Sequence, residues 1–182
     1  MYTVQNQIES NYRTFLSIAD QAISLSKYNQ DWQRMFQDEK LRLAPLLCPW
    51  VEGGIEHVGS TAVVGMVAKP VINIMVGVKS LIASKEAIQV LTQHGYCYYP
   101  YKADVMHWFC KPTPEFRTHH LHLVPFDSAL WQERISFRDK LRASSDLRAE
   151  YCALKQRLAQ QYKDDREQYT QQKWPFISRV LA

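Results

Sequence analysis

Two nearby segments read His57-Val58-Gly59-Ser60-Thr61 and Ala68-Lys69-Pro70-Val71-Ile72-Asn73-Ile74. A Gly-Ser turn that leaves a strand and opens a helix points free backbone N–H groups and two hydroxyls toward a space where a phosphate fits. Lys69 adds positive charge nearby, and Asn73 is a polar side chain inside an apolar strand, where burial demands a reason for it. A second interpretation stays open, in which the turn only caps a helix and Asn73 satisfies a buried backbone group.

Strands are predicted on both sides of this turn. Residues 54–58 and Val71–Val78 are short and have the β-rich character of strands, and the second is apolar on nearly every position, which is typical of a central strand. Residues 96–101, 105–111 and 120–126 follow, joined by short polar links that favour antiparallel pairing. The sequence therefore predicts a mixed sheet of about five strands.

Helical periodicity fills most of the remaining sequence. An amphipathic helix over residues 5–25 is expected to precede the main fold. A helix is predicted over residues 31–49, with Asp31 as its cap and Pro45 bending or dividing it. Two more are predicted over residues 82–94, ended by Gly95, and over residues 128–143. A helix over residues 146–162 is capped by Ser144 and Ser145, and a last helical segment begins with a capping box of Asp164 and Glu167 and is kinked or restarted at Pro175. Together these elements predict one α+β domain with helices flanking the sheet and a helical C-terminal part.

Composition narrows the class of protein. The 182 residues are 46% hydrophobic and 22% charged, as in an ordinary globular domain. The longest apolar run, Val71–Val78, is too short to cross a bilayer, and no secretory signal is visible, so a cytoplasmic location is expected. Four cysteines without paired spacing indicate reduced, mostly buried thiols rather than a zinc site or a disulfide framework. The net charge of +4 suits an anionic ligand and is too small to demand nucleic acid as a partner.

Five motifs occur in order along the chain: His57-Val-Gly-Ser-Thr-Ala, Ala68-Lys-Pro-x-Ile, Phe137-Arg-Asp-x-Leu-Arg142, Tyr151-x-x-Leu-Lys155 and Asp165-Arg-Glu-x-Tyr-Thr-x-x-Lys173. In combination they resemble the GrpB family, which has a nucleotidyltransferase-like fold. The resemblance begins at about Tyr28, so it divides the sequence into an N-terminal helical extension, residues 1–27, and a GrpB-like domain, residues 28–182. It implies a pocket for a nucleotide or another phosphorylated small molecule, with transferase activity as a hypothesis.

The matching positions lack the carboxylates with which active nucleotidyltransferases hold Mg²⁺ against the phosphates. The resemblance implies Asp where this sequence has Asn73, and the second acidic position of the wider superfamily is Met75. Because Asn73 is a neutral oxygen donor and Met75 is no ligand for a hard cation, a two-carboxylate site for Mg²⁺ or Mn²⁺ at these positions is excluded. Any divalent metal would need other ligands, and Asn73 is retained as a candidate catalytic residue.

Histidines are the other polar groups expected near Asn73. Period-two alternation puts His120 and His122 on one face of their strand and His119 on the opposite face. In the sheet order that the resemblance implies, this strand lies near Asn73, and His57 ends a neighbouring strand. Metal binding, contact with an anionic substrate or acid–base chemistry, and support of the structure alone all stay open. Of the three, His122 is the candidate catalytic residue, and His57 and His120 are candidate substrate contacts.

The C-terminal helices carry basic and aromatic residues that would neutralise a phosphate if they faced the same cleft. Arg142 is a further cation in the matched motifs. Such residues equally form surface ion pairs or solvated faces. The complete predicted substrate-binding set is His57, Gly59, Ser60, Thr61, Lys69, His120, Arg138, Lys155, Tyr169 and Lys173.

Several functions remain open at this point. The aromatic residues between Tyr98 and Phe109 would stack on a base or pack in the core. The N-terminal helix would cover an exposed face or make a homodimer contact. The first functional hypothesis is a nucleotidyltransferase-like protein that binds a phosphorylated small molecule, and the second is a catalytically silent binding or regulatory module. A third, RNA binding, has little support from the net charge and would show a steep salt dependence.

Overall fold

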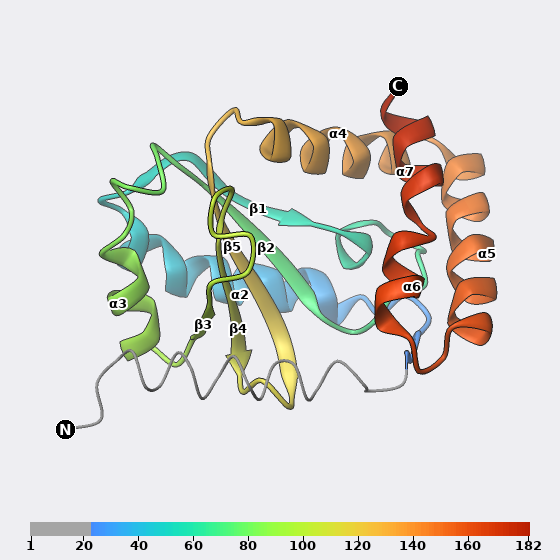
Figure 1. Ribbon diagram of the computed structural model, residues 1–182, viewed down its shortest axis with the longest axis horizontal. Helices are drawn as coiled ribbons and strands as arrows, with labels where there is room; N and C mark the ends of the chain where they lie inside the picture. Colours follow the sequence, from blue (N-terminus) through green and yellow to red (C-terminus); the bar gives the residue numbers. More distant parts are fainter. Residues whose placement is uncertain (1–22) are drawn as a thin grey trace.

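The computed structural model describes residues 23–182, and its centre is a five-stranded sheet with the strand order β1-β2-β5-β4-β3 (Figure 1). The strands are β1 Val51–Val58, β2 Ile72–Val78, β3 Cys97–Tyr99, β4 His107–Pro112 and β5 Arg117–Pro125. β2 and β5 run parallel, and every other neighbouring pair is antiparallel. The mixed sheet is therefore confirmed, and β2 lies inside it as its apolar sequence predicts.

Helices flank this sheet and make up the C-terminal part of the fold. They are α2 Asp31–Leu47, α3 Ala87–Gln93, α4 Ala129–Ala143, α5 Ser145–Gln161, α6 Arg166–Gln171 and α7 Trp174–Leu181, and residues Ser60–Ala62 form a short 3₁₀ helix. Figure 1 shows α2 behind the sheet and α5, α6 and α7 grouped at one end of it. The α+β class and the helical C-terminal part are confirmed. Within residues 23–182, no helix is both long enough and apolar enough to cross a membrane.

The strand residues alternate between two cores. On one face, Ile74 and Leu121 pack with Trp32, Phe36 and other apolar residues of α2. On the other face, Met75 and Trp108 belong to a second core that Trp131 of α4 completes. The alternation follows from the period of two in a strand, and it decides which side chains reach the face that α4 and the C-terminal helices cover.

Helix boundaries differ from the predictions where side chains compete for the backbone. The predicted helix over residues 82–94 is shorter, because Ser80 Oγ accepts a hydrogen bond from Ala83 N and turns occupy the chain as far as Glu86. Gly95, with a φ of +84°, follows the helix as predicted.

Two predicted caps were also wrong. The side chain of Asn29, rather than Asp31, accepts a backbone hydrogen bond at the start of α2. Asp165 rather than Asp164 caps α6, by accepting from Gln168 N over 2.9 Å. Each is a shift of one or two residues among several polar side chains that could all cap a helix.

The two prolines in predicted helices behave differently. α2 continues through Pro45 without division, since this residue lies near the end of the helix on its exposed side, where the carbonyl that loses its backbone partner is open to solvent. Pro175 lies in the first turn of α7, so the restart of the helix is confirmed. Pro112, which directly follows the predicted strand over residues 105–111, is the last residue of β4.

Residues 23–27 pack on the domain as extended chain. Ile23 N donates a hydrogen bond to Lys163 O over 2.8 Å, and Ser26 pairs with Ala68 in an antiparallel bridge. Residues 23–25, predicted as the end of the first helix, are therefore not helical. The rest of that helix, with its proposed roles as a cover or a homodimer contact, lies outside the described residues.

The cysteines are free but not mostly buried. Only Cys110 is buried, whereas Cys48 is exposed and Cys97 and Cys152 are partly exposed. The prediction of mostly buried thiols was wrong, because composition does not report on which side of a strand or helix each residue falls.

Candidate functional site

The Gly59-Ser60 turn lies directly beside Asn73. β1 and β2 pair so that Val58 faces Asn73, and the turn follows at the end of β1. Gly59 has a φ of +74°, and a Cβ at this position would lie 3.3 Å from Asn73 Nδ2. The positive φ strongly favours glycine, and a larger residue would also push against the Asn73 side chain. The turn is thereby held close against β2, with the 3₁₀ helix of Ser60–Ala62 behind it.

Asn73 connects the turn to β5, the strand that carries His120. Its Nδ2 donates to Val71 O over 3.2 Å, which leaves Oδ1 as an acceptor 3.3 Å from His120 Nδ1. The interpretation in which Asn73 satisfies a buried backbone group is therefore confirmed for its amide nitrogen, which bonds to Val71 O. Burial, followed by the charges of His122 and Arg117, holds the pKa of His120 well below its usual range. The ring is neutral, and its Nδ1–H donates to Asn73.

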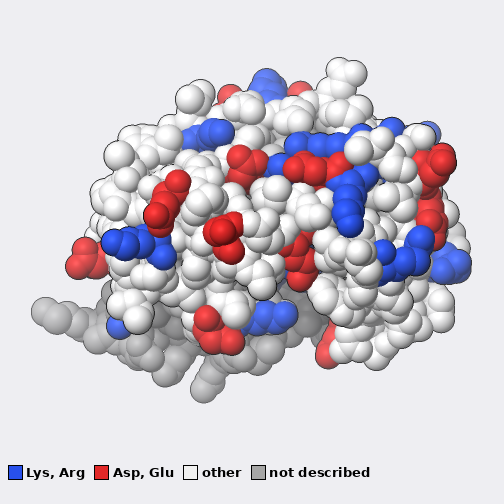
Figure 2. Space-filling model, turned by 90° about the horizontal axis from the view of Figure 1, so that it is seen from above, with Lys and Arg blue, Asp and Glu red and all other residues white. Residues whose placement is uncertain are grey.

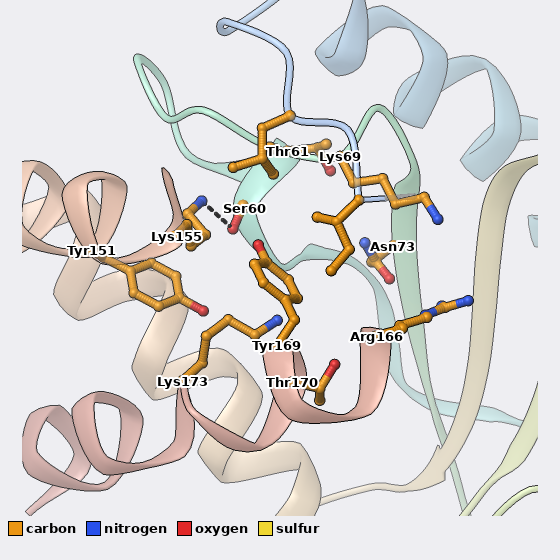
Figure 3. Close-up of a pocket in the computed structure, with 13 residues that line it drawn as sticks. Ser60, Thr61, Lys69, Asn73, Tyr151, Lys155, Arg166, Tyr169, Thr170 and Lys173 are labelled. Carbon is orange, nitrogen blue, oxygen red and sulfur yellow. Dashed lines mark hydrogen bonds between the residues drawn. The ribbon is translucent and has the colours of Figure 1, made fainter. Parts of the chain in front are cut away.

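A cavity of about 190 Å³ opens between this turn and the C-terminal helices (Figure 3). We call it the lysine cavity. Its polar lining is Ser60, Thr61, Lys69, Asn73, Tyr151, Lys155, Arg166, Tyr169, Thr170 and Lys173, and Ile23, Leu25 and Ala68 add apolar surface. Four of these side chains are cations, and no Asp or Glu is among the described residues that line the cavity.

Lys155 joins α5 to the turn. Its Nζ donates a hydrogen bond to Ser60 Oγ over 2.9 Å and a second to Val67 O, and it lies 4.8 Å from the centre of the Tyr151 ring. The residue is only 3% exposed. Burial, with the nearby charge of Lys173, lowers its pKa to about 7. This ammonium group is therefore poised between its charged and neutral forms near physiological pH.

The other cations of the cavity repel one another. Burial, followed by the charges of Arg134 and Arg166, lowers the pKa of Lys173 to about 8, and its Nζ lies 4.1 Å from the centre of the Tyr169 ring. Lys69 stands at the exposed rim, where partial desolvation and the charges of Arg166 and Arg117 lower its pKa to about 8. Within residues 23–182, none of the cations lining the cavity pairs with a carboxylate.

This one-sided charge contrasts with the outer surface. On the face seen in Figure 2, Lys and Arg side chains lie next to Asp and Glu side chains, so charges of both signs alternate. In the lysine cavity, by contrast, every charged residue of the described lining is a cation. Unbalanced positive charge in a hollow of low dielectric attracts anions more strongly than the same charge on an open surface.

A second cavity of about 190 Å³ shares Ser60, Asn73, Tyr151 and Lys173 with the first. We call it the histidine cavity. The side chains it adds include His122, Arg134, Met75 and Met106. His122 Nδ1 lies 3.4 Å from Met106 Sδ, and burial together with Arg134 lowers the His122 pKa to about 3. His122 is therefore a neutral hydrogen-bonding group at physiological pH.

A third cavity of about 790 Å³ shares Arg166 and Thr170 with the lysine cavity. We call it the aromatic cavity. Its lining is Tyr101, Lys102, Trp108, His120, Arg166, Glu167, Thr170, Gln171 and Trp174. The three cavities thus form one connected region around Asn73 and the start of α6.

The donor set around Asn73 does not fit a hard divalent cation. Asn73 Oδ1 is engaged by His120, and Met75 offers a thioether, which Mg²⁺ and Mn²⁺ do not bind well. Among residues 23–182, no group of three or more His, Cys, Asp and Glu side chains is placed to hold a metal ion. We therefore derive no metal-assisted step at this site.

Most of the predicted site residues lie on this connected region. Ser60, Thr61, Lys69, Asn73, Lys155, Tyr169 and Lys173 line the lysine cavity, Gly59 and His122 line the histidine cavity, and His120 lines the aromatic cavity. The predicted opposition of His119 to His120 and His122 also holds. His119 lies beside Ile72, a residue of the core under α2, whereas His120 and His122 lie beside Asn73 and Met75 on the other face.

His57 lies on the opposite face of the sheet from the cavities. Its ring stacks on Phe36 at 4.7 Å between centres, and its Nε2 lies 3.0 Å from Thr61 Oγ1. Alternation along β1 turns His57 away from the face that Val58 and Asn73 share. Burial and the charges of Arg142 and Arg138 lower its pKa to about 3, so the expectation of a substrate contact is replaced by a structural position.

Arg138 and Arg142 also lie outside the cavities. Arg138 Nη1 donates to Glu56 Oε2 over 2.6 Å and to His57 O over 3.0 Å. Arg142 donates to Ala62 O through Nε and Nη2. The expected phosphate contact is replaced in both residues by hydrogen bonds that fix α4 to β1 and to the turn.

Sequence reasoning missed Tyr151, Arg166 and Thr170 as cavity residues, although each stands in a quoted motif. The missing signal was helical spacing. Tyr151 and Lys155 are four residues apart on α5, and Arg166, Tyr169 or Thr170, and Lys173 follow at steps of three and four. Residues at such steps share one helix face.

Known proteins of similar sequence can now be compared with this site. A family model described as GrpB protein matches residues 22–182. The chain belongs to the GrpB family. The glutamate-rich protein GrpB of Alkalihalophilus pseudofirmus is 36% identical over 164 residues, which cover 87% of this chain and 94% of that protein. The crystal structure of GrpB from Enterococcus faecalis is similar with a TM-score of 0.77 and 28% identity, over 86% of this chain and 94% of the other.

A longer protein contains a GrpB-like segment. The dephospho-CoA kinase of Mycolicibacterium paratuberculosis is 31% identical over 153 residues, which cover 68% of this chain and 36% of that kinase. The chain therefore spans about a third of that relative.

Proposed function

We propose that this GrpB protein binds a nucleotide or another phosphorylated small molecule in the lysine cavity. The proposal rests on the four cations of this cavity, Lys69, Lys155, Arg166 and Lys173. Among the described residues, no carboxylate lines the cavity beside them. Burying like charges together is unfavourable, and the lowered pKa values of the three lysines report that cost. A polyphosphate supplies the missing counter-charge.

The hydrogen-bond donors of the cavity support the same ligand class. Ser60 and Thr170 bring hydroxyl groups, and Arg166 brings a planar fork of donors that matches phosphate oxygens. Figure 3 shows Lys155 and Lys173 on one side of the cavity and Lys69, Asn73 and Arg166 on the other. A ligand between the two sides would meet cations from both.

The family comparison adds a ligand to the candidates. One relative is named dephospho-CoA kinase, and its GrpB-like segment is only part of that protein. Coenzyme A precursors therefore belong in a ligand screen beside nucleotides and sugar phosphates.

A catalytically silent binding or regulatory module is the second candidate. It is favoured by Asn73 and Met75, which do not offer a divalent cation the carboxylates that nucleotidyltransferases use. Under the transferase hypothesis, Asn73 and His122 would act on the phosphate that lies nearest Ser60, since both line the histidine cavity with it. Metal-dependent binding with chemistry at the α-phosphate would favour the transferase, and metal-independent binding without turnover would favour the module.

A thermal-shift screen tests binding before any reaction is assumed. Nucleotides, coenzyme A precursors, sugar phosphates and tripolyphosphate are compared with and without Mg²⁺ or Mn²⁺, because a ligand that binds only the folded state raises the melting temperature. Lys69→Ala should weaken polyphosphate binding more than binding of an uncharged nucleoside. The matched control is Lys85→Ala, which removes an exposed lysine outside the three cavities. Equal losses for both ligands, or a melting temperature that no phosphorylated compound raises, would contradict the proposal.

A further inference from the structure

The aromatic cavity adjoins the lysine cavity and has a different lining. Arg166 and Thr170 line both cavities, so the two hollows lie side by side and share part of their wall. The aromatic cavity's volume of about 790 Å³ lies in the range of cavities that hold small organic ligands, roughly 300–1,000 Å³. The lysine cavity, at about 190 Å³, accommodates only the charged end of such a ligand.

Flat rings form the floor and the rim of the aromatic cavity. Trp108 and His120 lie at the floor with ring centres 5.0 Å apart, and both are tied into the sheet by the pairing of β4 with β5. His120 is neutral, and the guanidinium carbon of Arg117 lies 5.6 Å from the centre of the Trp108 ring, so one cation stands beside the floor. Tyr101 and Trp174 stand at the rim with 44% and 51% of their surface exposed.

The exposed rim aromatics are unusual for residues of their size. Large aromatic side chains normally bury most of their surface in a core, so Trp174, with 51% of its surface exposed beside a hollow, indicates a surface that a ligand can cover. Tyr101 comes from the loop between β3 and β4, and Trp174 begins α7. Two rings from separate elements therefore border one hollow.

The remaining lining residues are polar, so the cavity suits a ligand with hydrogen-bonding groups better than a hydrocarbon. Gln171 Nε2 donates to Glu167 Oε1 over 2.9 Å, so α6 presents a carboxylate and an amide to the cavity. Such groups accept hydrogen bonds from N–H groups at the edge of a heterocycle. Arg166 and Lys102 lie on the same lining and favour the electron-rich face of an aromatic ring.

We propose that the aromatic cavity binds the heteroaromatic base of a nucleotide whose phosphates occupy the lysine cavity. The proposal rests on the phosphate site proposed above and deepens it, because it selects nucleotides over sugar phosphates and other ring-free phosphorylated molecules. The base stacks against the rim rings Tyr101 and Trp174, and its polar edge faces Glu167 and Gln171.

Calorimetry with adenosine triphosphate, guanosine triphosphate and inorganic tripolyphosphate tests this assignment on the full chain. Stacking of a base on an aromatic side chain is worth about 1–3 kcal/mol, so at least one of the two nucleotides should bind about fivefold or more tightly than tripolyphosphate. Trp174→Leu should remove most of that advantage, and Trp174→Phe should retain it, since phenylalanine restores a flat ring. Tripolyphosphate should bind all of these variants equally.

Ile82→Ala is the matched control, because Ile82 is 90% exposed and lies outside the three cavities. It should leave every affinity unchanged, and an unchanged melting temperature for each variant shows that it is folded. Equal affinity for nucleotides and tripolyphosphate would overturn the base site and leave the phosphate site standing. Failure of all three ligands to bind would overturn both, and loss of tripolyphosphate binding in Trp174→Leu would assign Trp174 to the structure of the site instead.

Discussion

Lys155 Nζ donates a hydrogen bond to Ser60 Oγ over 2.9 Å, and this contact joins a helix to a turn 95 residues earlier in the chain. It places a buried cation at the one point where the Gly-Ser turn, β2 and the C-terminal helices meet. Lys155 is only 3% exposed, so bulk water screens its charge less than that of Lys69 at the exposed rim.

Replacing this charge is the most direct test of the site. Lys155→Met keeps the length and the apolar stem of the side chain and removes the ammonium. Because charge-assisted hydrogen bonds are worth about 1.5–3 kcal/mol, we expect the affinity for tripolyphosphate to fall at least about tenfold. Calorimetry measures the affinity, with Lys85→Met as control. An affinity within twofold of the parent protein would show that the cavity does not receive phosphate.

The affinity for polyphosphate should fall as the pH rises from 7 to 9. A polyphosphate favours the ammonium form, and the pKa values of Lys155, Lys173 and Lys69 are lowered to about 7, 8 and 8, so each loses its proton within this window in the unliganded protein. Binding at pH 8 should therefore take up protons, which calorimetry in buffers of different ionisation enthalpy measures directly. His122 titrates far below this range, and the raised pKa of Tyr169, about 12, lies above it.

The ligand for this experiment is a nucleoside triphosphate, because the last ionisation of its terminal phosphate, near pH 6, lies below this window. In the double variant Lys155→Met with Lys173→Met, the pH dependence should become shallow. A pH profile that is flat in the parent protein, or equally steep in the double variant, would mean that other groups bind the ligand.

Asn73→Asp should strengthen binding of Mn²⁺. The substitution places a charged oxygen at the position where the family resemblance implies a carboxylate, beside Ser60 and facing His120. Since ligand charge tunes the affinity of oxygen sites over several decades, we expect a gain of at least about tenfold in Mn²⁺ affinity in the presence of a nucleoside triphosphate. Asn73→Ala removes the oxygen and is the control. Calorimetry that detects no difference between the two variants would count against this pocket.

Arg138→Lys should destabilise the protein without weakening ligand binding. The guanidinium spans Glu56, His57 O and Asp139, and an ammonium group cannot reproduce that fork. Hydrogen bonds to charged groups contribute about 1.5–3 kcal/mol, so we expect a loss of that order in the free energy of unfolding measured in urea. Polyphosphate affinity at a temperature where the variant is folded should stay within about twofold. A loss of polyphosphate affinity without a loss of stability would show that Arg138 takes part in ligand binding.

Strand periodicity was the strongest predictor of the site. Alternation along β5 correctly separated His119 from His120 and His122, because the side-chain direction in a strand depends only on sequence parity. The apolar run of β2 correctly indicated an inner strand, which placed Asn73 next to the histidines once the parallel pairing with β5 was known. The mixed sheet and the class of the fold followed from the same local patterns.

Long-range partners could not be predicted. For Arg138 the sequence left a phosphate contact and an ion pair both open, and its partner Glu56 lies 82 residues away on β1. His57 had the same parity as Ile55, a residue of the core under α2, but sequence alone does not say which face of the sheet carries a site. Phe36, on which His57 stacks, comes from a helix whose docking the local pattern does not fix.

The walls of the lysine cavity come from segments that are far apart in the chain. Lys69 and Asn73 belong to the sheet side, whereas Arg166, Thr170 and Lys173 come from α6 and the residue that precedes α7. Helices of six and eight residues have little stability of their own, and they persist through what they touch. A ligand that contacts both walls would hold α6 and α7 against the sheet side of the cavity. Amide hydrogen exchange in these two helices should therefore slow when the ligand binds. Exchange would then report binding at backbone sites that take no part in any reaction.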